Sequence, residues 1–171
     1  VHIYAHGTPS FMDVGKEMAS KFNLKTTWSD DPKVFKAILE TSDVYKTAAE
    51  GEKVLVIIHS CRIGRSYTDE NGNYIPSYAE KMSAQFPNLT IIAPDERDAF
   101  DVGKEWGPYK IVDPKNLRGD YKDGAKHTTG DEEGNWNVFE GGKLIGSYNN
   151  NYDPSSAPNW FDNLVNYTTN K

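Results

Sequence analysis

The chain has 171 residues, a formal net charge of −6 and a hydrophobic content of 37%. This acidic balance argues against nucleic acid and anionic membrane surfaces as partners, because both are recognised by clustered Lys and Arg. No apolar run approaches the roughly 20 residues that cross a bilayer. The length fits one domain, residues 1–171. Because it opens directly into a strand-like segment, we expect this domain to be cut from a longer protein.

The first part of the chain carries one strand signal and two helix signals. Residues 1–5 (VHIYA) predict a short strand, and a helix is expected over residues 10–22. Asp31 before Pro32 is a strong helix start, since an N-cap oxygen is followed by a residue that needs no N–H partner there. An apolar stripe then predicts that this second helix continues to about Gly51.

Two further strands and one helix follow. The run at residues 54–58 (VLVII) does not alternate and is rich in β-branched residues, which predicts a strand buried on both faces of a parallel sheet. Residues 64–76 are polar and are expected to form a loop. Ser77 and Glu80 match a capping box at the start of a helix. Residues 89–93 predict another central strand.

The remainder of the chain changes character. Residues 109–112 are expected to form a strand and residues 116–135 a loop, while residues 136–140 and 143–148 flank a Gly-Gly pair and predict a hairpin. A short final helix is expected near residues 160–165. The alternation of strands and helices predicts an α/β fold, with a mostly parallel sheet, helices on both faces and a C-terminal β-hairpin.

Reactive residues follow the first two predicted strands, at the edge where sites form in parallel sheets. His6 and Gly7 end the first strand and Cys61 ends the second. If the strands are neighbours, His6 reaches the Cys61 thiol and activates it as a nucleophile. The backbone N–H groups of Gly7 and Cys61 would then form an oxyanion hole. The structural alternative is that His6 caps a strand end and Cys61, the only cysteine, is a small core residue.

This pattern, VHIYAHG followed by VLVIIHSC, resembles the caspase-fold cysteine peptidases of clan CD, in which one strand ends in His-Gly and the next in a small residue and Cys. The chain is most similar to the caspase-like C-terminal domains of RHS-type bacterial polymorphic toxins and to toxin autoprocessing domains. The matching pieces are S-C-x-x-G at residues 60–64, a strand ending in Ala93 and Pro94, and G-x-W-x-x-F at residues 134–139. The resemblance spans roughly residues 1–148.

The resemblance implies a cysteine endopeptidase that uses a dyad of Cys61 and His6, needs no third catalytic residue, and requires neither cofactor nor metal. Its substrate would be a protein or peptide. The chain would be the toxic or self-processing domain of a secreted bacterial effector, delivered into a target cell as part of a larger protein. A cognate immunity protein is a candidate partner. The insert at residues 65–76 departs from the family pattern and is a candidate lid or processing site.

In the related peptidases, the loop after the strand that follows the nucleophile contributes to the pocket for the residue before the cut. Asp95, Glu96 and Asp98 are therefore the predicted substrate-binding residues. Their carboxylates favour Arg or Lys over Asp at the cleaved position, because like charges repel in a low dielectric. If Arg97 points inward instead, the preference inverts. A solvated turn without a pocket is the structural alternative.

Two other functions compete with the peptidase. In a serine esterase of the α/β-hydrolase type, Ser60 would attack, and Asp95 or Asp98 followed by His127 would complete the order Ser, Asp, His. The glycines that such a nucleophile turn requires two positions before and after the serine are missing here. The other competitor is a non-catalytic binding or adaptor domain on the same fold.

Overall fold

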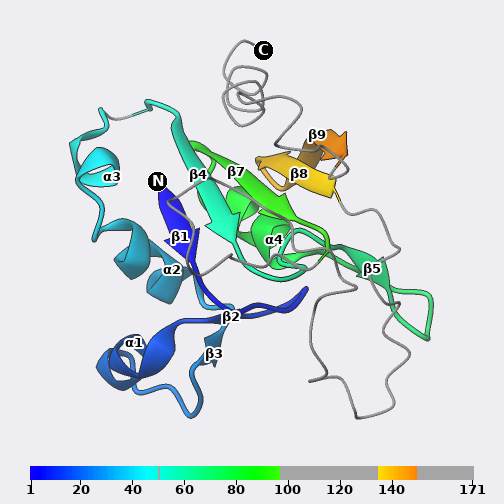
Figure 1. The fold of residues 1–171 in the computed structure, drawn as a ribbon, viewed down its shortest axis with the longest axis horizontal. Helices are drawn as coiled ribbons and strands as arrows, with labels where there is room; N and C mark the ends of the chain where they lie inside the picture. Colours follow the sequence, from blue (N-terminus) through cyan, green and yellow to red (C-terminus); the bar gives the residue numbers. More distant parts are fainter. Residues whose placement is uncertain (50, 97–134, 150–171) are drawn as a thin grey trace, which may run out of the picture.

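A five-stranded sheet lies at the centre of the computed structural model, which describes residues 1–49, 51–96 and 135–149 (Figure 1). Its strands, in spatial order, are β1 (His2–Tyr4), β4 (Val54–His59), β7 (Leu89–Pro94), β8 (Asn135–Glu140) and β9 (Lys143–Asn149). β1, β4 and β7 are mutually parallel, whereas β8 and β9 add as an antiparallel hairpin. The predicted α/β character, the position of β4 between β1 and β7, and the late hairpin are confirmed.

The parallel register brings the ends of the first two strands level. Tyr4 of β1 is paired with His59 of β4, the last residue of each strand. The arrowheads of β1 and β4 accordingly lie together in Figure 1. On the other side of β4, Val54 is paired with Leu89 of β7. The carboxyl ends of the parallel strands therefore share one edge of the sheet, as the sequence predicts.

One face of the sheet packs against α2 (Pro32–Leu39) and α4 (Tyr78–Gln85). Phe35 of α2 meets Tyr78 of α4 edge-on, with ring centroids 5.8 Å apart. Their core partners on the strands include Val56, Ile58, Ile91 and Phe139. The opposite face is also buried at Ile57, Ile92 and Val138. β4 and β7 are thus buried on both faces, as their apolar runs predict, while helices on the second face stay a prediction.

The helix expected over residues 10–22 is shorter and begins later. The segment forms β2 (Met12–Asp13), which pairs with β3 (Trp28–Ser29), and then α1 (Gly15–Lys21). The backbone N–H of Asp13 donates to His6 O at 2.9 Å and that of Val14 to Thr27 O at 2.8 Å. Because these groups bond to distant segments, they are not available to a helix.

The helix expected to run to Gly51 ends at Leu39, and a separate helix follows as α3 (Asp43–Thr47). Thr41 turns its hydroxyl back to Ile38 O at 2.7 Å, and Ser42 has extended backbone angles. Small polar side chains offer such alternatives to helical hydrogen bonding. The predicted start is confirmed, since the Asp31 carboxylate accepts a hydrogen bond from Lys33 N at 2.8 Å.

The loop expected at residues 64–76 contains a small hairpin, β5 (Tyr67–Thr68) and β6 (Tyr74–Ile75). Its turn is organised by Asp69, whose carboxylate accepts from the backbone N–H groups of Asn71 and Asn73. The next helix starts as predicted, with Ser77 Oγ accepting from Glu80 N at 3.1 Å. The strand expected at residues 109–112 and the helix near 160–165 lie outside the described residues. So does the loop expected at 116–135, except for Asn135, which is the first residue of β8.

Across the described ranges, no helix combines the length and apolar character needed to cross a membrane.

A matched pair of leucines tests the core. Leu89 of β7 is fully buried, whereas Leu144 of β9 is 56% exposed. We expect Leu89→Ala to lower the free energy of unfolding by about 2–5 kcal/mol, because it leaves a cavity in a packed interior. Leu144→Ala should change it by less than about 0.5 kcal/mol. Urea titration of both variants measures the difference, and equal effects would contradict this packing.

Candidate active site

The candidate dyad lies where β1 and β4 end. Pairing between the strands extends past Tyr4, since Ala5 N donates to His59 O at 3.1 Å. His6 and Cys61 each follow the last residue of their strand by two positions. Neighbouring strands lie about 4.7–4.9 Å apart. His6 is exposed and Cys61 is half-buried, so the edge between them is open to solvent.

Gly7 packs directly against the segment that carries Cys61. A Cβ atom at Gly7 would clash with Ser60 Oγ and lie 3.2 Å from Cys61 O, so only glycine fits without movement. Gly7 also forms an isolated antiparallel bridge with Met12. The hydrogen bonds around this bridge use the N–H groups of Thr8 and Asp13. Neither of these two bonds uses the Gly7 N–H.

Ser60 is in a different position from its neighbour Cys61. Its side chain is 1% exposed, and its Oγ has no hydrogen-bond partner among the described residues. The hydroxyl is directed at the Cα of Gly7. A buried hydroxyl in van der Waals contact with backbone is poorly placed to attack a substrate, which disfavours the serine esterase alternative.

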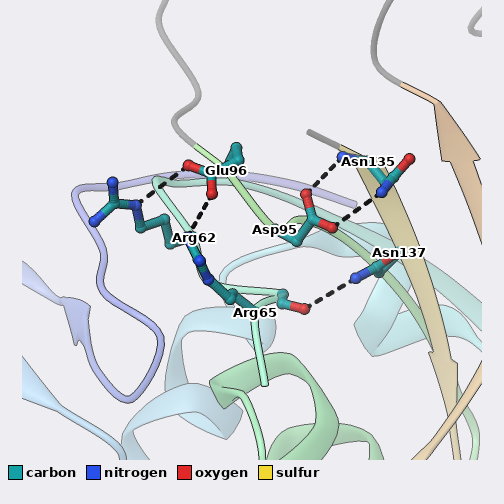
Figure 2. A network of polar contacts seen from close by, with 7 residues as sticks. Arg62, Arg65, Asp95, Glu96, Asn135 and Asn137 are labelled. Atoms are coloured by element: carbon teal, nitrogen blue, oxygen red, sulfur yellow. Dashed lines mark hydrogen bonds and ion pairs between the residues drawn. The ribbon is translucent and has the colours of Figure 1, made fainter. Parts of the chain in front are cut away.

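A polar network joins the turn after Cys61 to the end of β7 (Figure 2). The Glu96 carboxylate lies between two guanidinium groups: Arg62 Nε donates to it at 3.4 Å, and Arg65 Nη1 donates to its other oxygen. The Asp95 carboxylate accepts from Asn135 N at 2.5 Å and from Asn135 Nδ2 at 3.3 Å. Glu96 is thus neutralised by cations, whereas the bonds to Asp95 come from neutral donors.

A cavity of about 550 Å³ opens beside this network. Both described members of the predicted substrate-binding set, Asp95 and Glu96, line it, together with Arg65 and Asn137. Asp98 lies outside the described residues, as do Arg97 and His127. The remaining wall is largely apolar and includes Tyr74 of β6, Phe139 of β8 and Leu144 of β9. The cavity therefore combines charged groups with an apolar rim.

Sequence reasoning missed the residues that hold these groups in place. Arg62 and Arg65 follow the cysteine within four positions, and Asn137 Nδ2 donates to Gly64 O at 3.2 Å. The one sequence signal for this network was the presence of two positive charges three residues apart in a turn, which indicates a shared acidic partner. Their shared partner Glu96 is more than 30 residues away in sequence and could not be assigned.

A stack of aromatic rings supports β4 just before the cysteine. His59 is fully buried, stacks on Tyr4 at 4.4 Å between centroids, and shares a hydrogen bond of 3.1 Å with His2. Burial, followed by the nearby His59, lowers the pKa of His2 from its ordinary value. A neutral imidazole has one N–H donor and one acceptor nitrogen, so one of the two rings can donate and the other accept in the hydrogen bond between His2 and His59. His2 and Tyr4 alternate along β1, so the period-2 pattern was the signal for this stack.

Comparisons with protein-family models, curated proteins and solved structures found no match. Within the described ranges, no three His, Cys, Asp or Glu side chains gather as metal ligands would. The fold and the site define an α/β domain with a Cys and a His at one edge of a mixed sheet.

The contact between Gly7 and Ser60 can be tested by compensation. We expect Gly7→Ala to lower the free energy of unfolding by about 1–3 kcal/mol, as overpacking does. Ser60→Ala removes the clashing oxygen, so Gly7→Ala/Ser60→Ala should recover most of the loss. Ser60→Ala alone should be nearly neutral, because it deletes a buried hydroxyl that lacks a partner. Chemical denaturation of the four proteins measures this; strictly additive losses would contradict the contact.

Proposed function

We propose that this chain is a cysteine endopeptidase with a caspase-like fold, in which Cys61 is the nucleophile and His6 the base. The observation that carries the proposal is the parallel register of β1 and β4, whose last pair, Tyr4 and His59, lies two residues before His6 and Cys61 in each segment. A thiol needs a neighbouring base to become a reactive thiolate at neutral pH. The close packing of Gly7 on residues 60–61 adds the second element that acyl transfer needs, a backbone donor near the nucleophile.

The proposed reaction proceeds in two halves. The Cys61 thiol gives its proton to His6, and its sulfur attacks the peptide carbonyl carbon. The N–H groups of Gly7 and Cys61 stabilise the resulting oxyanion. The C–N bond then breaks, His6 protonates the leaving amine, and a thioester remains on Cys61. Water, deprotonated by His6, attacks the thioester and releases the carboxylic acid product and the thiol.

The cavity supports a preference for a cationic side chain at the cleaved position. Glu96 is offset by Arg62 and Arg65, whereas the described partner of Asp95 is the neutral Asn135. Asp95 is therefore the carboxylate whose charge a guest in the cavity would experience. A Lys or Arg side chain would complement it, and an Asp side chain would be repelled.

The biological setting extends the same proposal. A self-processing or toxic peptidase domain of a secreted bacterial effector would cleave its parent chain or a protein of the target cell. A cognate immunity protein would then bind the same edge of the sheet in the producing cell. Incubation of the domain with its full-length parent distinguishes self-processing from target cleavage.

The nucleophile is tested by thiol labelling. Cys61 is the only cysteine, so iodoacetamide incorporation reports on this residue alone. We expect rapid labelling at pH 7 in the wild type and much slower labelling in His6→Ala, because the thiolate loses its base. Asp43→Ala, which removes an exposed side chain of α3, serves as the control and should label like the wild type. Equal and slow labelling in wild type and His6→Ala would exclude the dyad.

Peptide cleavage by the same proteins separates the competing functions. Cys61→Ala should abolish cleavage, and His6→Ala should lower it by about 10²–10⁴-fold, the usual contribution of a general acid–base. Ser60→Ala should remain active. An ester hydrolase that survives Cys61→Ala and is lost in Ser60→Ala would support the esterase instead. Binding that persists in Cys61→Ala, without any cleavage by the wild type, would support the adaptor.

Specificity is tested with paired peptides that carry Arg or Asp before the cut. We expect the wild type to prefer Arg, and Asp95→Asn to reduce that preference by about 12- to 150-fold, as expected for a hydrogen bond to a charged group of about 1.5–3 kcal/mol. Asp43→Asn, an exposed carboxylate on α3, is the control. An unchanged preference in Asp95→Asn would remove Asp95 from the site.

A further inference from the structure

The residue that follows the cysteine has an unusual backbone conformation. Arg62 has a φ of 56°, in the left-handed region that residues with a side chain rarely adopt. Such a conformation persists only where the surrounding structure imposes it, and it concentrates at functional sites. Since Arg62 is bonded directly to Cys61, whatever imposes this conformation also restrains the Cys61 backbone.

The groups that hold Arg62 in this conformation belong to Glu96, which follows the end of β7. Glu96 O accepts a hydrogen bond from Arg62 N at 2.9 Å, so the main chain of Glu96 holds the left-handed residue. The Glu96 carboxylate also accepts a hydrogen bond from Arg62 Nε and another from Arg65 Nη1, as Figure 2 shows. Arg65 N in turn donates to Arg62 O at 2.9 Å and closes the turn. One glutamate thus contacts both ends of the turn that begins at Cys61.

The sheet keeps Glu96 itself in place. Gly64 N donates to Pro94 O at 2.8 Å, and the neighbouring Asp95 is bonded to Asn135 through both its main chain and its side chain. Asn137 of β8 donates to Gly64 O. The turn is therefore fastened to two adjacent strands, and Glu96 supplies its charged contacts.

We infer that Glu96 is a positioning residue for Cys61 and not a contact for the substrate. Each of its carboxylate oxygens already accepts from a guanidinium group, and its side chain is only 18% exposed. Two guanidinium groups already compensate the charge of Glu96, which weakens its attraction for a cationic substrate group. The Arg62–Glu96–Arg65 clamp instead holds the turn so that the Cys61 thiol and N–H keep one orientation. This inference rests on the proposed function only in taking Cys61 as the reactive thiol.

The test compares Glu96→Gln with the wild type in two measurements. Gln keeps the shape but loses the charge that binds two guanidinium groups. We expect the rate of Cys61 alkylation and the kcat for peptide cleavage to fall about tenfold, within the range for residues coupled through one network. The KM should stay within about twofold, since uniform binding is not removed. A raised KM confined to cationic peptides, with normal alkylation, would make Glu96 a substrate contact and overturn the inference.

A second substitution distinguishes positioning from general damage. Glycine adopts positive φ without strain, so Arg62→Gly removes the need for the clamp. In the Arg62→Gly background, the further change Glu96→Gln should slow alkylation by less than threefold, against about tenfold in the wild-type background. The same loss in both backgrounds would overturn the inference.

Glu140→Gln is the matched control. Glu140 is a partly buried carboxylate, 24% exposed against 18% for Glu96, and it pairs with Lys53 at the opposite end of the sheet. The Glu140→Gln variant should lose a similar ion pair, the one with Lys53, and should alkylate at Cys61 as fast as the wild type. Alkylation does not require peptidase activity, so the inference can fail or hold independently of the proposed function. Melting temperatures of all variants establish that each is folded.

Discussion

The parallel pairing of β1 with β4 is the constraint on which the rest of the site depends. Parallel strands run in the same direction, so their carboxyl ends meet at one edge, and the backbone register decides which residues face each other there. A slip of one residue would move every side chain to the other face. The register is held by the alternation of buried and exposed residues on β1, by the aromatic stack at its end, and by the continuous apolar run of β4.

The edge beyond these strands is built mainly from backbone contacts. Gly7 lies close to Ser60 because it has no side chain, and the turn after Cys61 is bonded to Pro94 and Glu96 through main-chain N–H groups. Backbone groups are fixed by the sheet and lose little freedom when a substrate binds, so they are well suited to stabilise charge in a reaction. Charged side chains add the second layer, with Glu96 between two arginines and Asp95 facing the cavity.

The sequence was sufficient for the parts of the fold that depend on local patterns. The runs at β4 and β7, the cap at Asp31 and the hairpin around its Gly-Gly pair all follow from residue type and spacing. It was insufficient where a distant segment decides the outcome. Met12 and Asp13 form a strand because Trp28 and Ser29 pair with them. The break after Leu39 arises because small polar side chains compete with backbone N–H groups for the helix carbonyls, and hydrophobic periodicity does not report on this competition.

The candidate site divides in the same way. His6 and Cys61 were identifiable because reactive residues at strand ends have a general meaning in parallel sheets. The left-handed conformation of Arg62 was not, because nothing in an arginine side chain favours it. Its N–H is bonded to the main chain of Glu96, which the fold brings next to it from the segment after β7. Interactions of this kind are visible only once the three-dimensional register is known.

Among the described residues, the hydrogen bonds that anchor the hairpin after the cysteine lie at its base. Ser66 Oγ donates to Glu80, Tyr74 OH donates to the same carboxylate, and Ser77 N donates to Ser66 Oγ. The tip at residues 69–73 bonds chiefly to itself. Because lengthening an exposed tip costs little chain entropy, this is the place where an affinity tag or a fluorescent reporter can be spliced into the chain. A label introduced there would be attached next to Tyr74, which lines the cavity.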